Sequence, residues 1–257
     1  LHIQKTSLKL QVFCFLMQQN TSPAKPSSLM EDGMPSAPRL MPKSPKSHKH
    51  VPAPWTLQGE GIVLLFHFKK DWVAQAANLP VYLQGKFKGG FGYVMLVDYQ
   101  ESPVGPYREL LFIPGKFGEE KLQSITTIFV DSEASTANGR ANWAIPKQTA
   151  DFHWQKEKRL DRVEVFLNGK LVFQTSIRSG GMSFPMSTAL LPIRLRQELG
   201  NQVFFTQPEG KGWGKLARIQ ELKLDPQFFP DIRDIKPLLA LKVSPFTLTF
   251  PKPSIPA

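Results

Sequence analysis

Two residues of the sequence carry groups that can do chemistry and stand among apolar neighbours. Glu109 interrupts the apolar run RELLFI at 108–113, and Lys147 follows Pro146 at the end of the mostly apolar stretch GRANWAIPKQ. A carboxylate can transfer protons, and a neutral lysine amine is a nucleophile. Whether either residue acts in this way depends on whether the fold brings it into the interior.

The alternation of residues around Glu109 directs this side chain inward. With a period of two, Glu109 shares one face with Leu111 and Ile113, and Arg108 lies on the other face. Both faces are largely apolar, and a carboxylate between them is costly unless it is paired or protonated. The pattern alone favours a buried ion pair with Arg108 or Arg140.

Lys147 has a simple alternative, which is a surface lysine on a turn. Pro146 disfavours the helical conformation for Ile145 and moves it toward an extended one. A lysine that follows such a turn usually lies in water, so composition alone favours this alternative.

The elements that must position these residues are predominantly strands. Short β-rich segments separated by turn signals recur along the chain, at 61–68, 89–99, 108–113, 124–131, 161–177, 201–207, 216–224 and 238–243. Asn168-Gly169 stands between two such runs and is the signature of a two-residue hairpin turn. We expect a short helix or irregular turn over 134–143, and either helix or strand over 194–200.

Strands and helices do not alternate in this sequence as they do in a parallel α/β sheet. Many strands with little helical cover are typical of a closed barrel or a sandwich. We therefore predict a mainly β fold over 55–257, an antiparallel β-barrel-like single domain with few short helices.

Two glycine-rich stretches lie at 85–93 (GKFKGGFGY) and 210–215 (GKGWGK). Neither has the spacing of a P-loop or precedes a helix whose N-terminus could hold an anion. We expect the first at a strand bend or barrel corner and the second in a loop. The GxSxG elbow of serine hydrolases is absent from the sequence. No feature marks a serine nucleophile that could form a hydrolase triad with Asp151 and His153.

Residues 1–54 differ in character from the rest of the chain. They hold seven lysines and arginines against two acids, and eight prolines fall within 21–54. Such a segment buries too little apolar surface to offset its ordering entropy. We read 1–54 as a disordered or mis-annotated N-terminal arm, in which Met17, Met30 or Met34 could be the true start.

The formal charge is +11, but outside the arm it is spread among acids. The sequence shows no basic helix and no basic run interleaved with aromatics, so we expect no nucleic-acid or membrane partner. The alternative, in which the arm binds an anionic partner, ranks last.

A single cysteine, Cys14, excludes an intramolecular disulfide and suits the cytoplasm. No Cys/His cluster has zinc spacing, so we expect neither a metal nor a cofactor.

Two blocks of the sequence together resemble the acetoacetate decarboxylase superfamily. They are SPVGPYRELLFIPG at 102–115 and IFVDSEASTANGRANWAIPKQTADF at 128–152. The shared pattern is a strand with an internal Glu, a strand ending in Asp-Ser, a Gly-Arg pair and a Pro-Lys about seven residues beyond the Gly. The resemblance covers roughly 55–250 and is strongest over 93–152. It implies a β-barrel-like domain whose interior holds the active site, commonly in homo-oligomers.

The resemblance also implies roles for the two residues. Lys147 would be the Schiff-base lysine, whose imine with a substrate ketone withdraws electrons so that carbon dioxide leaves and an enamine remains. Glu109 would transfer protons in the pocket. The remaining site residues that we expect are substrate contacts at Arg108, Tyr93 and Ile145, and structural or pKa-tuning residues at Arg140 and Gln148.

The sequence departs from the family pattern in ways that bear on the substrate. Gln148 stands where the decarboxylases have a second lysine, and Tyr93 or Gly92 stands where they have a second pocket glutamate. The pocket arginine has its nearest counterpart around Gly59. The pKa of Lys147 must therefore be lowered by burial, or by an arginine such as Arg108 or Arg140.

The expected function is a lyase that acts on a small keto acid or related carbonyl compound through a lysine Schiff base. A Schiff-base aldolase or dehydratase is one alternative, and a barrel that binds an apolar small molecule without turnover is another. The expected partners are a small-molecule carbonyl substrate and further copies of the chain.

Overall fold

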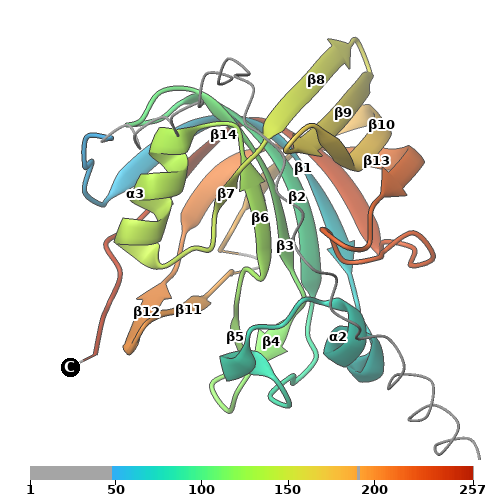
Figure 1. Ribbon diagram of the computed structural model, residues 1–257. Helices are drawn as coiled ribbons and strands as arrows, with labels where there is room; N and C mark the ends of the chain where they lie inside the picture. The colour runs from blue at the N-terminus through green and yellow to red at the C-terminus, as the bar shows by residue number, and fades with distance from the viewer. Residues whose placement is uncertain (1–47, 190–191, 257) are drawn as a thin grey trace, which may run out of the picture. The chain divides into compact units, whose positions relative to one another are not determined.

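The computed structural model describes residues 48–189 and 192–256 of the chain (Figure 1). Most of the arm predicted over 1–54 lies outside these residues, so its prediction stays a prediction. Residues 48–54 are described, and they hydrogen-bond to helix α3 (Glu133–Trp143). The Val51 amide donates to Asn138 Oδ1 at 2.7 Å, and the Val51 carbonyl accepts from Asn142 Nδ2 at 2.8 Å.

Strands make up most of the described chain, which confirms the predicted fold class. The longer strands are β1 (Trp55–Phe66), β2 (Gly92–Glu101), β3 (Tyr107–Ile113), β8 (Asp151–Glu157), β9 (Leu160–Leu167), β10 (Lys170–Ser187), β13 (Glu209–Leu224) and β14 (Leu239–Phe250). The shorter strands are β4 (Lys116–Phe117), β5 (Leu122–Gln123), β6 (Thr127–Val130), β7 (Gln148–Thr149), β11 (Leu195–Leu199) and β12 (Gln202–Thr206). Two further elements are short, the helix α2 (Lys70–Ala76) and the 3₁₀ turn η1 (Val81–Leu83).

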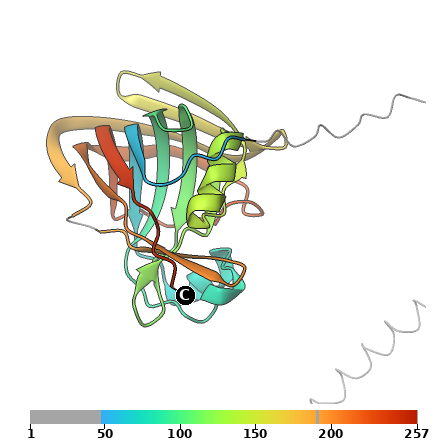
Figure 2. The ribbon, with the colours of Figure 1, turned by 90° about the vertical axis from the view of Figure 1, so that its left-hand side faces the viewer.

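Ten strands form one strongly curved sheet in the order β7-β6-β3-β2-β1-β14-β13-β10-β9-β8, and β12-β11-β5-β4 form a second sheet. The two edge strands of the large sheet, β7 and β8, are consecutive in the chain and are joined by Ala150 alone. The chain itself therefore connects the two edges, and the sheet is a nearly closed barrel (Figure 2). Neighbours in the large sheet are antiparallel apart from β6 and β7.

Both faces of the central strands are buried, each in a different apolar cluster. On β1, Leu57 and Trp55 belong to the cluster on the concave face, and Ile62 and Leu64 belong to the cluster on the other face. This arrangement explains why β1, β2 and β3 read as continuous apolar runs. Even-numbered and odd-numbered residues of β3 therefore face different clusters.

Helix α3 lies beside the β6–β7 edge of the large sheet (Figure 1). It begins at an N-cap, Ser132, whose Oγ accepts a hydrogen bond from the Ser135 amide at 3.1 Å. It ends at Ala144, which takes a left-handed conformation with φ of 54°. The tight end turns the chain back toward β7. Lys147, just beyond the helix, therefore lies next to its last turn.

Several local predictions can be compared directly with the structure. The Asn168-Gly169 hairpin is confirmed, with φ of 52° and 78° at the two turn residues. The expected helix over 134–143 is α3, and 194–200 is strand β11 rather than helix. The loop predicted over 210–215 is wrong, because these residues lie inside β13. A Cβ on Gly212 would lie 2.7 Å from the Pro245 carbonyl oxygen, so glycine here permits close strand contact.

The sequence gives no clear signal for α2, which is only seven residues long. No helix in the described part of the chain is long and apolar enough to cross a membrane.

Candidate active site

A cavity of about 430 Å³ lies on the concave face of the large sheet. Its walls come from alternate residues of β1, β2, β3 and β14, from the end of α3, and from the segments around β11 and the β10–β13 pair. Most of these residues are apolar, and aromatic side chains are prominent. The tryptophans Trp55 and Trp143 meet edge to face with ring centroids 5.0 Å apart. The cavity is therefore mostly apolar, with few polar groups.

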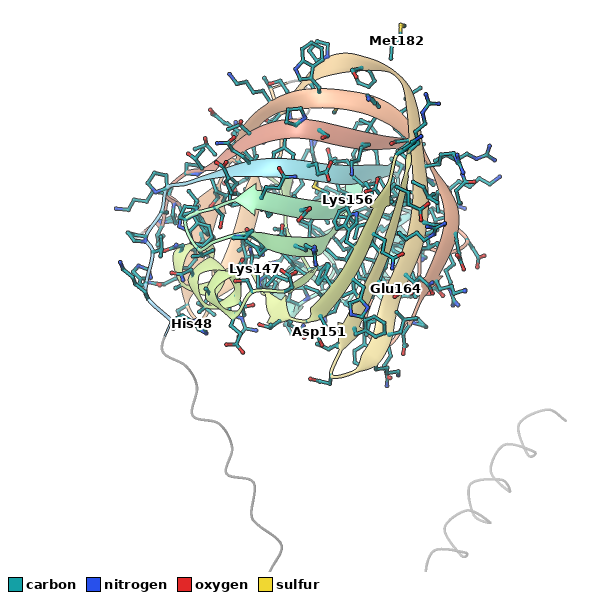
Figure 3. All side chains as sticks on the ribbon, turned by 90° about the horizontal axis from the view of Figure 1, so that it is seen from above. His48, Lys147, Asp151, Lys156, Glu164 and Met182 are labelled. Carbon is teal, nitrogen blue, oxygen red and sulfur yellow. The ribbon has the colours of Figure 1, made fainter. Side chains whose placement is uncertain are left out.

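Lys147 and Glu109 face each other in the wall of this cavity. Lys147 Nζ lies 2.9 Å from Glu109 Oε2, and the two side chains are 5% and 6% exposed. Glu109 lies on the cavity face of β3, opposite Val97 of β2 and Val130 of β6. Figure 3 shows Lys147 beside α3 within the curve of the sheet, whereas Met182 projects away from it. The structure thus brings together the two residues singled out in separate blocks of the sequence.

The pKa of Lys147 lies above the ordinary lysine value. Burial lowers this pKa, but the Glu109 carboxylate and the Tyr107 hydroxyl raise it and outweigh burial. The expected net depression is wrong, because Glu109 is so close. A raised pKa favours the ammonium form of Lys147, which must give up a proton before it can attack a carbonyl.

The structure explains why a Gly-Arg pair, Gly139 and Arg140, precedes Lys147. A Cβ on Gly139 would lie 2.7 Å from Lys147 Cδ and 2.9 Å from Cε, so the lysine side chain runs across the helix where this glycine leaves room. Arg140 Nε donates to the Lys147 carbonyl at 2.8 Å and fixes the backbone of the same residue. The motif therefore positions Lys147 at both its side chain and its main chain.

Three further polar residues surround the pair. Lys147 Nζ donates to Ser135 Oγ at 2.9 Å and lies 3.5 Å from the Tyr107 hydroxyl. Burial raises the pKa of Tyr107 to about 12, and burial with the nearby Glu109 raises the pKa of Tyr99 well above its ordinary value. Both phenols are thus neutral hydrogen-bonding groups. Period-2 alternation places Tyr107 beside Glu109, but nothing in the sequence marks Ser135.

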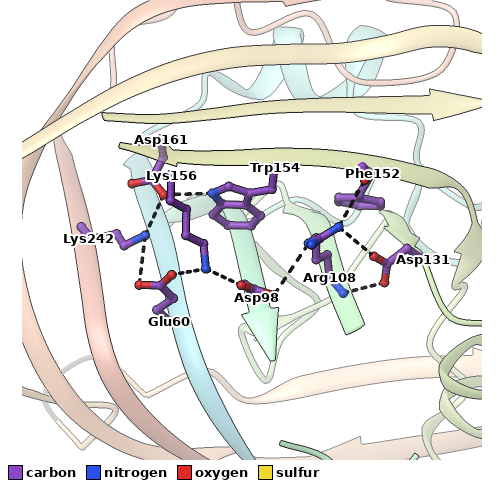
Figure 4. Close-up of polar contacts among 9 residues, drawn as sticks. All are labelled: Glu60, Asp98, Arg108, Asp131, Phe152, Trp154, Lys156, Asp161 and Lys242. Carbon is purple, nitrogen blue, oxygen red and sulfur yellow. Dashed lines mark hydrogen bonds and ion pairs between the residues drawn. The ribbon is translucent and has the colours of Figure 1, made fainter. Parts of the chain in front are cut away.

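Of the expected substrate contacts, Tyr93 and Ile145 line the cavity and Arg108 does not. Arg108 lies on the opposite face of β3, as the parity of the strand requires (Figure 4). Its guanidinium donates to the Phe152 carbonyl at 3.2 Å and lies 3.6 Å from Asp131. The expected contact between Arg108 and a substrate in the cavity is therefore corrected.

The two expected tuning residues also lie outside the cavity wall. Gln148 is exposed on edge strand β7, one residue beyond Lys147 and on the other side of the strand. A cation at this position would point away from the Lys147 amine, so the difference from the family pattern has little bearing on the charge of the cavity. Arg140 is exposed and acts on the Lys147 main chain, and neither it nor Arg108 contributes to the pKa of Lys147.

This arrangement can hold a carbonyl compound next to an amine, a carboxylate and three hydroxyl groups. The amine can attack the carbonyl carbon, and the carboxylate can carry protons between nitrogen, oxygen and carbon. In the described ranges, 48–189 and 192–256, no group of His, Cys, Asp and Glu side chains is placed to hold a metal ion.

Comparison with known proteins identifies a family. The family model described as acetoacetate decarboxylase (ADC) matches residues 36–189 of the chain. This match contains both sequence blocks and thus both Glu109 and Lys147. No curated protein sequence matches the chain at a significant level.

Solved structures share the fold at low sequence identity. The acetoacetate decarboxylase of Legionella pneumophila subsp. pneumophila str. Philadelphia 1 matches with a TM-score of 0.63 and 16% identity, over 85% of this chain and 93% of that chain. The enduracididine biosynthesis enzyme MppR, complexed with the condensation product of pyruvate and imidazole 4-carboxaldehyde, matches with a TM-score of 0.59 and 14% identity, over 80% and 90%. An acetoacetate decarboxylase-like enzyme from Sphingomonas wittichii RW1 matches with a TM-score of 0.54 and 12% identity, over 79% and 93%.

Proposed function

The chain belongs to the acetoacetate decarboxylase family, and from this membership we propose that it is a lyase that forms a Schiff base at Lys147. The substrate is a keto acid or a related carbonyl compound, and the bond that breaks joins the carbon next to the imine carbon to the group that leaves. The observation that carries the proposal is the 2.9 Å contact between Lys147 and Glu109, both buried in the wall of an apolar cavity.

Proton transfer within the ion pair begins the reaction. Since the raised pKa of Lys147 favours its ammonium form, Lys147 first passes a proton to Glu109 and becomes a neutral nucleophile. The amine then adds to the substrate carbonyl and forms a carbinolamine. Glu109 returns its proton to the leaving hydroxyl, water departs, and a protonated imine remains beside the carboxylate.

The protonated imine then accepts electrons from a neighbouring bond. When that bond breaks, its electron pair moves toward the imine and an enamine forms. Glu109 is placed to take or supply the proton that this step requires, because its carboxylate already contacts the lysine nitrogen. Hydrolysis of the imine releases the product and restores the ion pair.

The polar neighbours support this cycle by holding the reacting nitrogen in place. The Ser135 hydroxyl and the Tyr107 hydroxyl both contact Lys147 Nζ, and Gly139 leaves the groove in which the lysine methylenes lie. A buried lysine with three fixed polar partners loses little freedom when substrate binds, so its geometry is preorganised.

Borohydride trapping tests the proposal. The full chain is incubated with a panel of ketones, aldehydes and keto acids, reduced, and digested for mass spectrometry. We expect a stable adduct on Lys147 with at least one carbonyl compound and no adduct in the Lys147→Arg variant. Lys158→Arg, which changes an exposed lysine in the turn between β8 and β9, is the matched control and should label normally. Folded protein that gives no Lys147 adduct across the panel contradicts the proposal and favours a barrel that only binds.

A further inference from the structure

The charges of the cavity bear on the substrate that it can hold. Among the described residues that line it, the charged side chains are Lys147, Glu109 and Lys211. Lys147 and Glu109 neutralise each other at 2.9 Å. Lys211 is exposed on β13, and in the sheet β14, β1 and β2 lie between this strand and β3. Among the described residues, the ionisable groups that act on Lys147 are Glu109 and Tyr107, so no second cation lies next to the ion pair.

We infer that the substrate of this site is an uncharged ketone or aldehyde with an extended apolar body. The inference rests on the proposed Schiff-base function and narrows it. It excludes a compound whose carboxylate adjoins the carbonyl, because no described side chain next to Lys147 and Glu109 is a cation that would pair with that charge.

The balance of charge through the reaction supports an uncharged substrate. Imine formation converts an ammonium group and a carbonyl into a protonated imine and water, so the lysine nitrogen carries one positive charge before and after the step. Glu109 lends and regains one proton over the same step. The original ion pair thus becomes an iminium–carboxylate pair, and the apolar cavity never holds an uncompensated charge.

A keto acid changes this balance. Its carboxylate would bring a second negative charge next to Glu109, against the single positive charge on Lys147. An unpaired carboxylate in an apolar site is strongly disfavoured. The hydroxyl groups of Tyr99, Tyr107 and Ser135 can donate hydrogen bonds, but they are neutral and cannot supply the missing charge.

The size and lining of the cavity indicate the apolar body. A volume of about 430 Å³ is far larger than a three- or four-carbon keto acid needs. Aromatic rings surround it, and Tyr99 packs against Tyr107 at 4.7 Å and against Phe246 at 5.9 Å between ring centroids. These side chains suit an aromatic or branched alkyl group on the substrate carbonyl.

The inferred class also narrows the bond that breaks. Without a carboxylate on the substrate, carbon dioxide is not the leaving group. The electrons that form the enamine must come from a C–H bond, with the proton passing to Glu109, or from the carbon–carbon bond of a β-hydroxy ketone. In the second case the β-hydroxyl proton passes to Glu109 and an aldehyde leaves.

A matched pair of carbonyl compounds tests the inference. 4-Phenylbutan-2-one and 2-oxo-4-phenylbutanoate share the same body and differ by a methyl group in place of a carboxylate. Each is titrated against the full chain with borohydride reduction, and the Lys147 adduct is measured by peptide mass spectrometry. We expect half-maximal labelling at a concentration about ten-fold or more lower for the ketone. Acetone against pyruvate repeats the comparison without the aromatic body, and both should label more weakly than 4-phenylbutan-2-one.

Each outcome of this experiment has a distinct meaning. Equal or better labelling by the keto acid overturns the inferred substrate class and leaves the Schiff-base proposal intact. Labelling by acetone that equals that of 4-phenylbutan-2-one overturns the apolar body. Absence of any Lys147 adduct from folded protein, with circular dichroism as the check on folding, overturns the proposed function itself.

Discussion

Strand β3 carries two adjacent charged residues that serve different regions of the molecule. Glu109 faces the cavity, where it has a single ionic partner, Lys147. Arg108 faces the other side and belongs to a charged network, in which ion pairs and hydrogen bonds join other strands of the large sheet to its β8–β9 hairpin (Figure 4). The members of the network are Glu60, Asp98, Arg108, Asp131, Lys156, Asp161 and Lys242.

The two regions differ in how their charges are satisfied. In the network, Lys156 contacts both Glu60 and Asp98, and Lys242 contacts both Glu60 and Asp161. Burial raises the pKa of Glu60, but the two lysines outweigh burial and hold it below its ordinary value. In the cavity wall, Glu109 and Lys147 contact each other and both border the cavity. Shared partners fix a structure, whereas a single ion pair in a cavity wall leaves room for a substrate next to both groups.

The largest expected effect comes from removing Lys147. Lys147→Ala should abolish borohydride trapping and leave Glu109 buried without a cation. Breaking a buried ion pair in this way costs about 3–5 kcal/mol in the free energy of unfolding, measured by denaturant titration. The double variant Lys147→Met with Glu109→Leu should recover most of this loss, since it leaves no unpaired charge. A double variant no more stable than Lys147→Ala would show that the pair is not isolated.

Glu109→Gln is expected to separate proton transfer from imine formation. Without the carboxylate, burial alone acts on Lys147 and lowers its pKa, so the amine is neutral at lower pH and trapping should begin at lower pH than in the wild type. Exchange of substrate α-protons for deuterium should fall by about 10²-fold or more, because the proton acceptor is lost. A trapping profile that moves to higher pH would contradict the role given to Glu109.

The same pair predicts a pH dependence of stability. The pKa of Lys147 in the folded chain lies above the ordinary 10.5, so the contribution of this residue is fully present below that pH and is lost as the pH rises through the folded-state pKa. Glu109→Gln should lack this alkaline loss. Denaturant titrations of the two proteins on either side of pH 10.5 measure the difference.

Gly139→Ala tests the position of Lys147 without changing any charge. The added methyl group would meet the lysine methylenes at 2.7 Å, so the amine must move away from Glu109. Trapping should slow by about 10²-fold, because a displacement near 1 Å has effects of that order. Alanine favours the helix by about 1 kcal/mol over glycine, so folding should be kept. Ala141→Gly, at an exposed position of the same helix, is the matched control and should lower stability while trapping is unchanged.

The β-rich segments between turn signals correctly predict most of the strands, and period-2 alternation correctly predicts the inward direction of Glu109. The resemblance correctly predicts the fold, and the structure places Lys147 next to Glu109. Local pattern could not find Ser135, because its contact with Lys147 depends on how α3 docks against the sheet. It also could not determine the sign of the Lys147 pKa shift, which depends on a 2.9 Å distance between residues 38 positions apart. The catalytic roles, the homo-oligomer and the cytoplasmic location stay predictions.

The smallest expected effect comes from the charged network on the other face of β3. Lys156→Gln removes contacts to Glu60 and Asp98, but the lysine is partly exposed and water replaces much of what is lost. The free energy of unfolding should fall by less than about 1 kcal/mol. Trapping at Lys147 should be unchanged, because the intervening sheet separates the network from the cavity. If Lys156→Gln slowed trapping as much as Gly139→Ala does, the two faces of β3 would be coupled, and the contrast between a fixed network and an isolated reactive pair would no longer hold.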